Sequence, residues 1–156
     1  MKPVRIGEKL IGPGYPTYII AEAGVNHKGS MEAARRMIDE AKRAGADAIK
    51  FQTYKAEKLV TRAAPRYWDD PEDTGTQYAI FKRSDSFGEA EYCALFEHAQ
   101  NVGITWLSTP FDLDAVAFLD ELGMQAFKIA SADLTNYPLL MAVAKTGKPV
   151  ILSTGA

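Results

Sequence analysis

The strongest constraint on the fold is a pattern that occurs four times along the chain. In each copy a glycine is followed by a short apolar segment and then by hydroxyl or amide residues, and the copies begin at Gly45, Gly103, Gly123 and Gly147. A glycine in this position commonly ends a helix, and the apolar segment after it is typical of a buried strand. Repeated helix–strand units of this kind predict a parallel β-sheet covered by helices.

A fifth strand is expected before these units, over about residues 18–22. It leads into the segment 21–30, AEAGVNHKGS, which places Glu22, Asn26 and His27 within six residues. Ser30 suits the N-cap of an amphipathic helix that Gly45 ends. Residues 4–15 alternate weakly between apolar and turn residues, which predicts a β-hairpin. We therefore expect a hairpin cap over residues 1–16 and an α/β domain over residues 17–156.

Further helix starts are indicated by Asp112 as an N-cap, by Pro138 in a first turn, and by a capping box from Ser86 to Glu89. Residues 54–85 match no strand or helix pattern, and loops of this length are usually functional or mobile. Four aromatic residues in this segment either cover a site or pack within the loop itself: Tyr67, Trp68, Tyr78 and Phe81.

Five parallel strands are compatible with two architectures, an open doubly wound sheet or the first part of an eight-unit TIM barrel. Gly24 and Gly29 lack the spacing of a dinucleotide-binding turn, which favours the barrel. The expected fold class is thus α/β of the (β/α)8 TIM-barrel type, with about five of the eight βα units present. Because the sequence stops at 153–156, before a helix that could cover the fifth strand, we expect an incomplete barrel.

Composition limits the classes of partner. The net charge is −2 at pH 7, with acids and bases interspersed, which gives no electrostatic reason to expect nucleic acid or an acidic membrane surface. The chain has no apolar stretch near the roughly 20 residues of a membrane span. One cysteine, Cys93, excludes a disulfide framework within the chain, and we expect it to be a buried structural thiol. A cytoplasmic protein that acts on small molecules is the expectation.

In parallel α/β folds, ligands bind at the carboxyl ends of the strands. Lys50 and Lys128 lie there inside otherwise apolar strands, where an unpaired buried ammonium would cost several kcal/mol. Each lysine therefore requires an anion. That anion is either an internal carboxylate such as Glu22 or a bound phosphate or carboxylate, and the hydroxyl residues of the same rim favour the second.

Glu22 can act as an acid or base, orient a sugar hydroxyl, or neutralise a lysine. His27 is more typical of a hydrogen bond that organises a loop. The chain has two histidines, His27 and His98, and they lack the spacing of metal ligands.

Together these residues resemble the N-terminal barrel of the sialic acid synthases. The resemblance covers the chain from about Val4 and rests on motifs in the expected order: 20–29 (IAEAGVNHKG), 50–52 (KFQ), 108–111 (STPF), 127–133 (FKIASAD), 136–138 (NYP) and 153–155 (STG).

The resemblance implies a reaction. Phosphoenolpyruvate condenses with the open-chain aldehyde of an N-acetylated amino sugar such as N-acetylmannosamine, giving a nine-carbon 2-keto acid and phosphate. Water adds to the enol carbon, so that phosphate leaves by carbon–oxygen cleavage. A divalent metal, Mn²⁺ or Mg²⁺, polarises the aldehyde.

The resemblance also implies residue roles. Glu22 and Asp133 are the expected catalytic residues, and Asp133 stands where many members have glutamate. The expected substrate-binding residues are Asn26, His27, Lys50, Gln52, Thr109, Lys128, Ser131 and Ser153. No metal ligand is expected in this chain, because the family's metal-binding histidines lie after the fifth strand.

The family's C-terminal antifreeze-like domain, which reaches the active site of a partner subunit, also lies beyond this sequence. The full-length protein is expected to be a homodimer. We expect the 156-residue chain to be inactive alone and to self-associate through its exposed sheet edge.

Two alternatives stay open. A Schiff-base aldolase on the same barrel would use Lys50 or Lys128 as its nucleophile. A non-catalytic barrel fragment would only bind anions or a complementary half. The acylamino sugar is also open, because legionaminic acid synthases and spore-coat polysaccharide synthases share these motifs.

Overall fold

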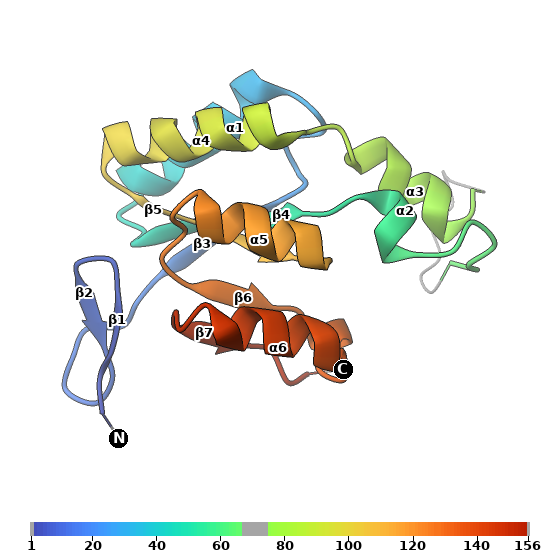
Figure 1. Cartoon of the computed structure of the whole chain (residues 1–156). Helices are drawn as coiled ribbons and strands as arrows, with labels where there is room; N and C mark the ends of the chain where they lie inside the picture. The colour runs from blue at the N-terminus through green and yellow to red at the C-terminus, as the bar shows by residue number, and fades with distance from the viewer. Residues whose placement is uncertain (1, 67–74, 156) are drawn as a thin grey trace.

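The computed structural model describes residues 2–66 and 75–155. An antiparallel hairpin is followed by strands that alternate with helices, as predicted (Figure 1). The elements are β1 (Val4–Ile6), β2 (Lys9–Ile11), β3 (Ile20–Gly24), α1 (Met31–Arg43), β4 (Ala48–Thr53), α2 (Ala56–Leu59), α3 (Gln77–Ser84), α4 (Glu89–Val102), β5 (Thr105–Pro110), α5 (Leu113–Glu121), β6 (Phe127–Ile129), the 3-10 turn η1 (Ser131–Asp133), α6 (Tyr137–Lys145) and β7 (Val150–Leu152). None of the helices in the described ranges is long and apolar enough to cross a membrane.

The strands form two parallel ladders. β3, β4 and β5 pair in that order, and β6 pairs with β7. β5 and β6 lie against each other, although within the described residues no ladder joins them. The single continuous parallel sheet expected from the sequence is therefore divided at this point.

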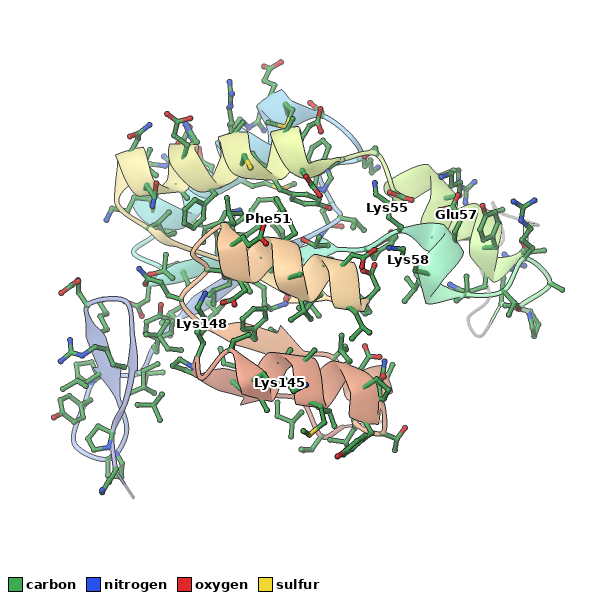
Figure 2. The ribbon with its side chains drawn as sticks, viewed as in Figure 1. Phe51, Lys55, Glu57, Lys58, Lys145 and Lys148 are labelled. Atoms are coloured by element: carbon green, nitrogen blue, oxygen red, sulfur yellow. The ribbon has the colours of Figure 1, made fainter. Side chains whose placement is uncertain are left out.

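One face of the sheet packs against the helices. Phe51 of β4 stacks on Trp106 of β5 with their ring centroids 5.9 Å apart, and Tyr92 of α4 meets the Trp106 ring edge-on at 6.3 Å. Phe51 lies between the strands and the helices (Figure 2). Because side chains alternate along a strand, Lys50 and Gln52 project from the opposite face.

The hairpin lies at the amino ends of the strands. Lys9 of β2 forms an ion pair with Asp47, the residue before β4. Gly7, in the hairpin turn, has a φ of +59°, and a Cβ there would lie 2.7 Å from Oε1 of Gln125, which precedes β6. Figure 1 shows the hairpin at the end of the molecule opposite α2, α3 and the C-terminus. The predicted hairpin is confirmed. It does not cover the carboxyl ends of the strands.

Helix boundaries are mostly as predicted. Ser30 and Asp112 cap α1 and α5 by accepting hydrogen bonds from the N–H groups of Ala33 and Ala115, at 3.1 and 2.8 Å, and Pro138 lies in the first turn of α6. The predicted cap of α4 is wrong. Gly88, not Ser86, is its N-cap, because the Glu91 carboxylate reaches back to the Gly88 N–H at 2.8 Å.

Two further expectations are corrected. Cys93 is exposed rather than buried, because it follows Tyr92 by one residue on α4 and so points away from the buried stripe of Tyr92, Leu95 and Ala99. Residues 54–85 are not a loop throughout, since they contain α2 and α3. Tyr67 and Trp68 lie outside the described residues. The Tyr78 hydroxyl donates to Glu57 Oε1 at 3.1 Å, a contact within this segment.

Candidate active site

The strand register gathers four of the expected site residues on one face. In the parallel ladders Glu22 lies opposite Lys50, and Gln52 lies opposite Thr109. Partners in a parallel register project to the same side of the sheet, and this is the side away from Phe51 and the helices. Glu22, Lys50, Gln52 and Thr109 therefore share the inner face of β3, β4 and β5, and Gln52 and Thr109 lie next to the carboxyl ends of β4 and β5.

Glu22 and Lys50 form an ion pair between the Glu22 Oε2 and Lys50 Nζ atoms. The Lys50 side chain is only 11% exposed, whereas that of Glu22 is 53% exposed. Gly24 lies beside both Glu22 and Gln52, because a Cβ at Gly24 would be 3.5 Å from Glu22 Oε1 and 3.9 Å from Gln52 Nε2. Lys50 thus has an internal carboxylate partner that remains accessible to solvent.

Lys128 extends this charge cluster from β6. Its Nζ donates to the carbonyl oxygen of Ile129 at 2.6 Å, and the Ser153 N–H after β7 donates to the same oxygen at 3.2 Å. Burial lowers the pKa of Lys128, the nearby Lys50 ammonium lowers it further, and Glu22 raises it in part. In the described part of the chain Lys128 has no carboxylate in ion-pair contact. The two lysines and Glu22 therefore interact electrostatically across β3, β4 and β6.

Ser131 and Asp133 lie in the turn η1 that follows β6, and Ser131, Asp133 and Ser153 are each partly buried. Asp133 Oδ1 accepts a hydrogen bond from Asn136 Nδ2 at 3.0 Å. Its Oδ2 is buried and has no hydrogen-bond partner among the described residues. One oxygen of this carboxylate is held by the protein, and the other is not.

Asn26 and His27 are placed differently. Asn26 is exposed in the turn after β3. His27 is buried, with its ring stacked on Phe87 at a centroid distance of 4.1 Å and its Nδ1 accepting from the Gly29 N–H at 3.1 Å. Burial lowers the pKa of His27, which favours the neutral ring. The His27 ring also lies 6.1 Å from that of Phe51, on the side of the helices. A substrate contact for Asn26 or His27 stays a prediction.

Asn136, which contacts Asp133, is not among the site residues expected from the sequence, although its place two residues before Pro138 is a recognisable N-cap signal. Its side chain accepts from the Leu139 N–H at 3.3 Å and so caps α6. Within residues 2–66 and 75–155, no three His, Cys, Asp or Glu side chains are grouped so that they could hold a metal ion. The described residues therefore do not fit the divalent metal that the resemblance implies.

Comparison with known proteins adds to this geometry. The N,N'-diacetyllegionaminic acid synthase of Legionella pneumophila is 39% identical over 152 residues, which are 96% of this chain and 42% of that protein. The human N-acetylneuraminate-9-phosphate synthase is also 39% identical, over 94% of this chain and 41% of its own. The chain thus spans less than half the length of these curated relatives.

A solved structure supports the fold. The crystal structure of an N-acetylneuraminic acid synthetase from Leptospira borgpetersenii, in complex with citrate, superposes with a TM-score of 0.83 and 39% identity, covering 99% of this chain and half of that one. The predicted TIM-barrel type of fold is confirmed. The family model described as "NeuB family" matches residues 37–156. The chain therefore belongs to the NeuB family, together with the sialic acid synthases that it resembles in sequence and fold.

Proposed function

We propose that this chain supplies the phosphoenolpyruvate-binding part of a sialic-acid-type synthase. The reaction would join phosphoenolpyruvate to the open-chain aldehyde of an N-acylated amino sugar, giving a nine-carbon 2-keto acid and phosphate. The observation that carries the proposal is the cluster of Lys50 on β4 and Lys128 on β6, where the Lys50 ammonium helps to lower the pKa of Lys128. Two neighbouring cations of this kind favour a multiply charged anion.

Phosphoenolpyruvate carries a phosphate and a carboxylate, and the rim offers donors for both. Lys50 and Lys128 would bind the charged oxygens, with Thr109, Ser131 and Ser153 as hydroxyl donors and Gln52 as an amide donor. The solved relative from Leptospira holds citrate, a small polycarboxylate, which supports an anion site in that protein and, by likeness, in this one.

The proposed chemistry forms one carbon–carbon bond and one carbon–oxygen bond, the second from water, and breaks the carbon–oxygen bond to phosphate. The methylene carbon of phosphoenolpyruvate attacks the aldehyde carbon, whose oxygen takes up a proton. Water then adds to the former enol carbon, and phosphate leaves with the electrons of the carbon–oxygen bond. In this proposal Glu22 and Asp133 would take or give these protons. A divalent metal would polarise the aldehyde, but the described residues do not hold one, and the proton-transfer roles of Glu22 and Asp133 are independent of it.

A chimeric enzyme tests this function. Residues 1–156 would replace the matching N-terminal part of the Legionella synthase, which is 39% identical to this chain. We expect release of phosphate and formation of a 2-keto acid from phosphoenolpyruvate and one of a panel of N-acylated amino sugars. The Lys50→Met and Lys128→Met double variant is expected to abolish both. A folded chimera that forms no keto acid with any sugar would contradict the proposal.

The 156-residue chain alone is proposed to be inactive, because it spans less than half of its curated relatives. Phosphate release together with keto acid formation by the purified chain would overturn this part of the proposal.

One observation favours a second function, a Schiff-base aldolase. The pKa of Lys128 is lowered, and a lysine that loses its proton more readily is a better nucleophile. Borohydride trapping with pyruvate distinguishes the two functions, because covalent labelling of Lys128 is expected only for the aldolase. A chimera that binds phosphoenolpyruvate but shows neither labelling nor keto acid formation would indicate an anion-binding module.

A further inference from the structure

Asn136 joins the turn that carries Asp133 to the start of helix α6. Its backbone N–H donates to the Asp133 carbonyl oxygen at 2.9 Å, and its side-chain Nδ2 donates to Asp133 Oδ1 at 3.0 Å. Its Oδ1 accepts from the Leu139 N–H at 3.3 Å. Both the oxygen and the nitrogen of the Asn136 side-chain amide are therefore hydrogen-bonded.

These contacts define which way the amide is oriented. A backbone N–H can donate only to the amide oxygen, so the Asn136 nitrogen must be the atom that faces Asp133. Asp133 Oδ1 is consequently an acceptor, and Oδ2 is left buried without a partner among the described residues. An unpartnered buried carboxylate oxygen is rare in folded proteins and calls for an explanation.

We propose that Asn136 is a positioning residue that holds Asp133 Oδ1 and so leaves Oδ2 as the oxygen that meets the substrate. This inference rests on the proposed function, in which Asp133 is a catalytic carboxylate. The aspartate side chain is one methylene shorter than glutamate. Its position therefore depends on the turn η1 that carries it and on the hydrogen bond from Asn136.

The competing explanation is that Asn136 only caps α6. Substitutions at this position separate the two explanations, because serine and aspartate cap helices about as well as asparagine. Asn136→Asp keeps a capping oxygen but has no donor for Asp133. Asn136→Ser keeps a capping oxygen on a side chain one bond shorter, so that a hydroxyl that caps α6 lies farther from Asp133. Asn136→Ala removes both contacts. If Asn136 only caps α6, the first two variants keep the melting temperature of the unsubstituted chain. If it also holds Asp133, they lose part of it at neutral pH, and the alanine variant loses more.

The direct test is an NMR titration of the Asp133 carboxyl carbon in the 156-residue chain. Loss of a hydrogen bond to the charged form favours the protonated carboxyl group, so the titration of Asp133 in Asn136→Ser is expected to lie at higher pH than in the unsubstituted chain. Asn136→Asp is expected to move this titration further in the same direction, because a second carboxylate is then adjacent.

A second measurement concerns the reaction itself. In the chimera with the Legionella synthase, the acid limb of the kcat/KM profile is expected to move to higher pH in Asn136→Ser, while KM for phosphoenolpyruvate stays the same. An Asp133 titration that is identical in Asn136→Ser and the unsubstituted chain would overturn the inference. So would a shifted titration with an unchanged pH profile, because Asn136 would then hold a carboxylate that takes no part in the reaction. If the unsubstituted chimera forms no keto acid, the proposed function fails, and the titration still decides whether the hydrogen bond controls Asp133.

Discussion

Lys50 of β4 is paired with Glu22 of β3, the residue directly opposite it in the parallel register. The lysine that we propose as a phosphate ligand is therefore already neutralised in the absence of substrate. Glu22 is far more exposed than Lys50, so the carboxylate can turn toward solvent while the ammonium stays in place. An incoming anion would compete with Glu22 for Lys50 or share it.

The Glu22→Gln substitution tests how much the Glu22–Lys50 ion pair contributes to the stability of the chain. It leaves a nearly buried ammonium without its counter-charge, and we expect the free energy of unfolding to fall by about 1 kcal/mol, a value limited by the exposure of Glu22. Urea denaturation measures the change. Adding Lys50→Met to Glu22→Gln is expected to restore part of the loss, and a Glu22→Gln chain as stable as the unsubstituted one would contradict the prediction.

Anion binding should depend on the two inner lysines and not on lysine content in general. We expect Lys50→Met and Lys128→Met each to weaken phosphoenolpyruvate binding at least tenfold, which is about 1.4 kcal/mol. Isothermal calorimetry gives the dissociation constants. Lys145 is exposed on α6, where Figure 2 labels it, so Lys145→Met is the matched control. Equal losses of phosphoenolpyruvate affinity in all three variants would show that the anion is attracted by positive charge in general, and would contradict the prediction.

The stability of the chain should fall in mild acid because of His27. Burial lowers the pKa of His27 from its ordinary value of 6.5, so the unfolded chain binds the proton more readily than the folded chain. The contribution to stability is therefore complete above about pH 6.5 and is lost as the pH falls toward the lowered value. Thermal unfolding between pH 8 and pH 5 measures it. His27→Phe is expected to remove this part of the pH dependence, whereas His98→Gln should retain it.

Asp85, at the end of the 54–85 segment, is hydrogen-bonded to residues at its start. Its side chain is 1% exposed, and it accepts from Lys55 Nζ at 2.9 Å and from the Ala56 N–H at 3.0 Å. We expect Asp85→Ala to lower the free energy of unfolding by about 2 kcal/mol and to speed tryptic cleavage after Lys58. The ion pair of Glu57 with Lys82 lies at the surface of the same segment (Figure 2), so Glu57→Gln is the control and should change neither property. Equal cleavage of both variants would count against the prediction.

The edge strand β7 should make the chain self-associate. Val150 and Leu152 are each 46% exposed, and within the described residues β7 pairs only with β6. A lysine on an exposed edge opposes strand pairing between molecules, so Val150→Lys is expected to lower the apparent mass in light scattering. Leu134→Lys replaces an exposed apolar residue outside the strands and should leave the mass unchanged. A monomeric unsubstituted chain would contradict the prediction.

Much of the fold could be predicted from local patterns. The repeated glycines, the apolar segments after them and the caps Ser30 and Asp112 are recognised over a few residues, and these determine helices and strands largely through nearby contacts. Two details of α4 differ from the prediction. The N-cap is Gly88, two residues after Ser86, and Cys93 is exposed although its neighbour Tyr92 is buried. Both depend on where the helix starts and which of its faces is buried, which the local sequence pattern does not define.

The sequence by itself determined that this chain alternates helices with parallel strands and carries two lysines inside apolar strands, because both properties are local. Only the tertiary structure decided that Glu22 neutralises Lys50, that Lys128 lies close enough to both for their charges to affect it, that His27 packs on Phe87, and that Asn136 holds one oxygen of Asp133. The first three depend on strand register and on residues far apart in sequence, and the last on the exact turn that follows β6. Local pattern does not encode such distances, because they are set by how the whole sheet and its helices pack.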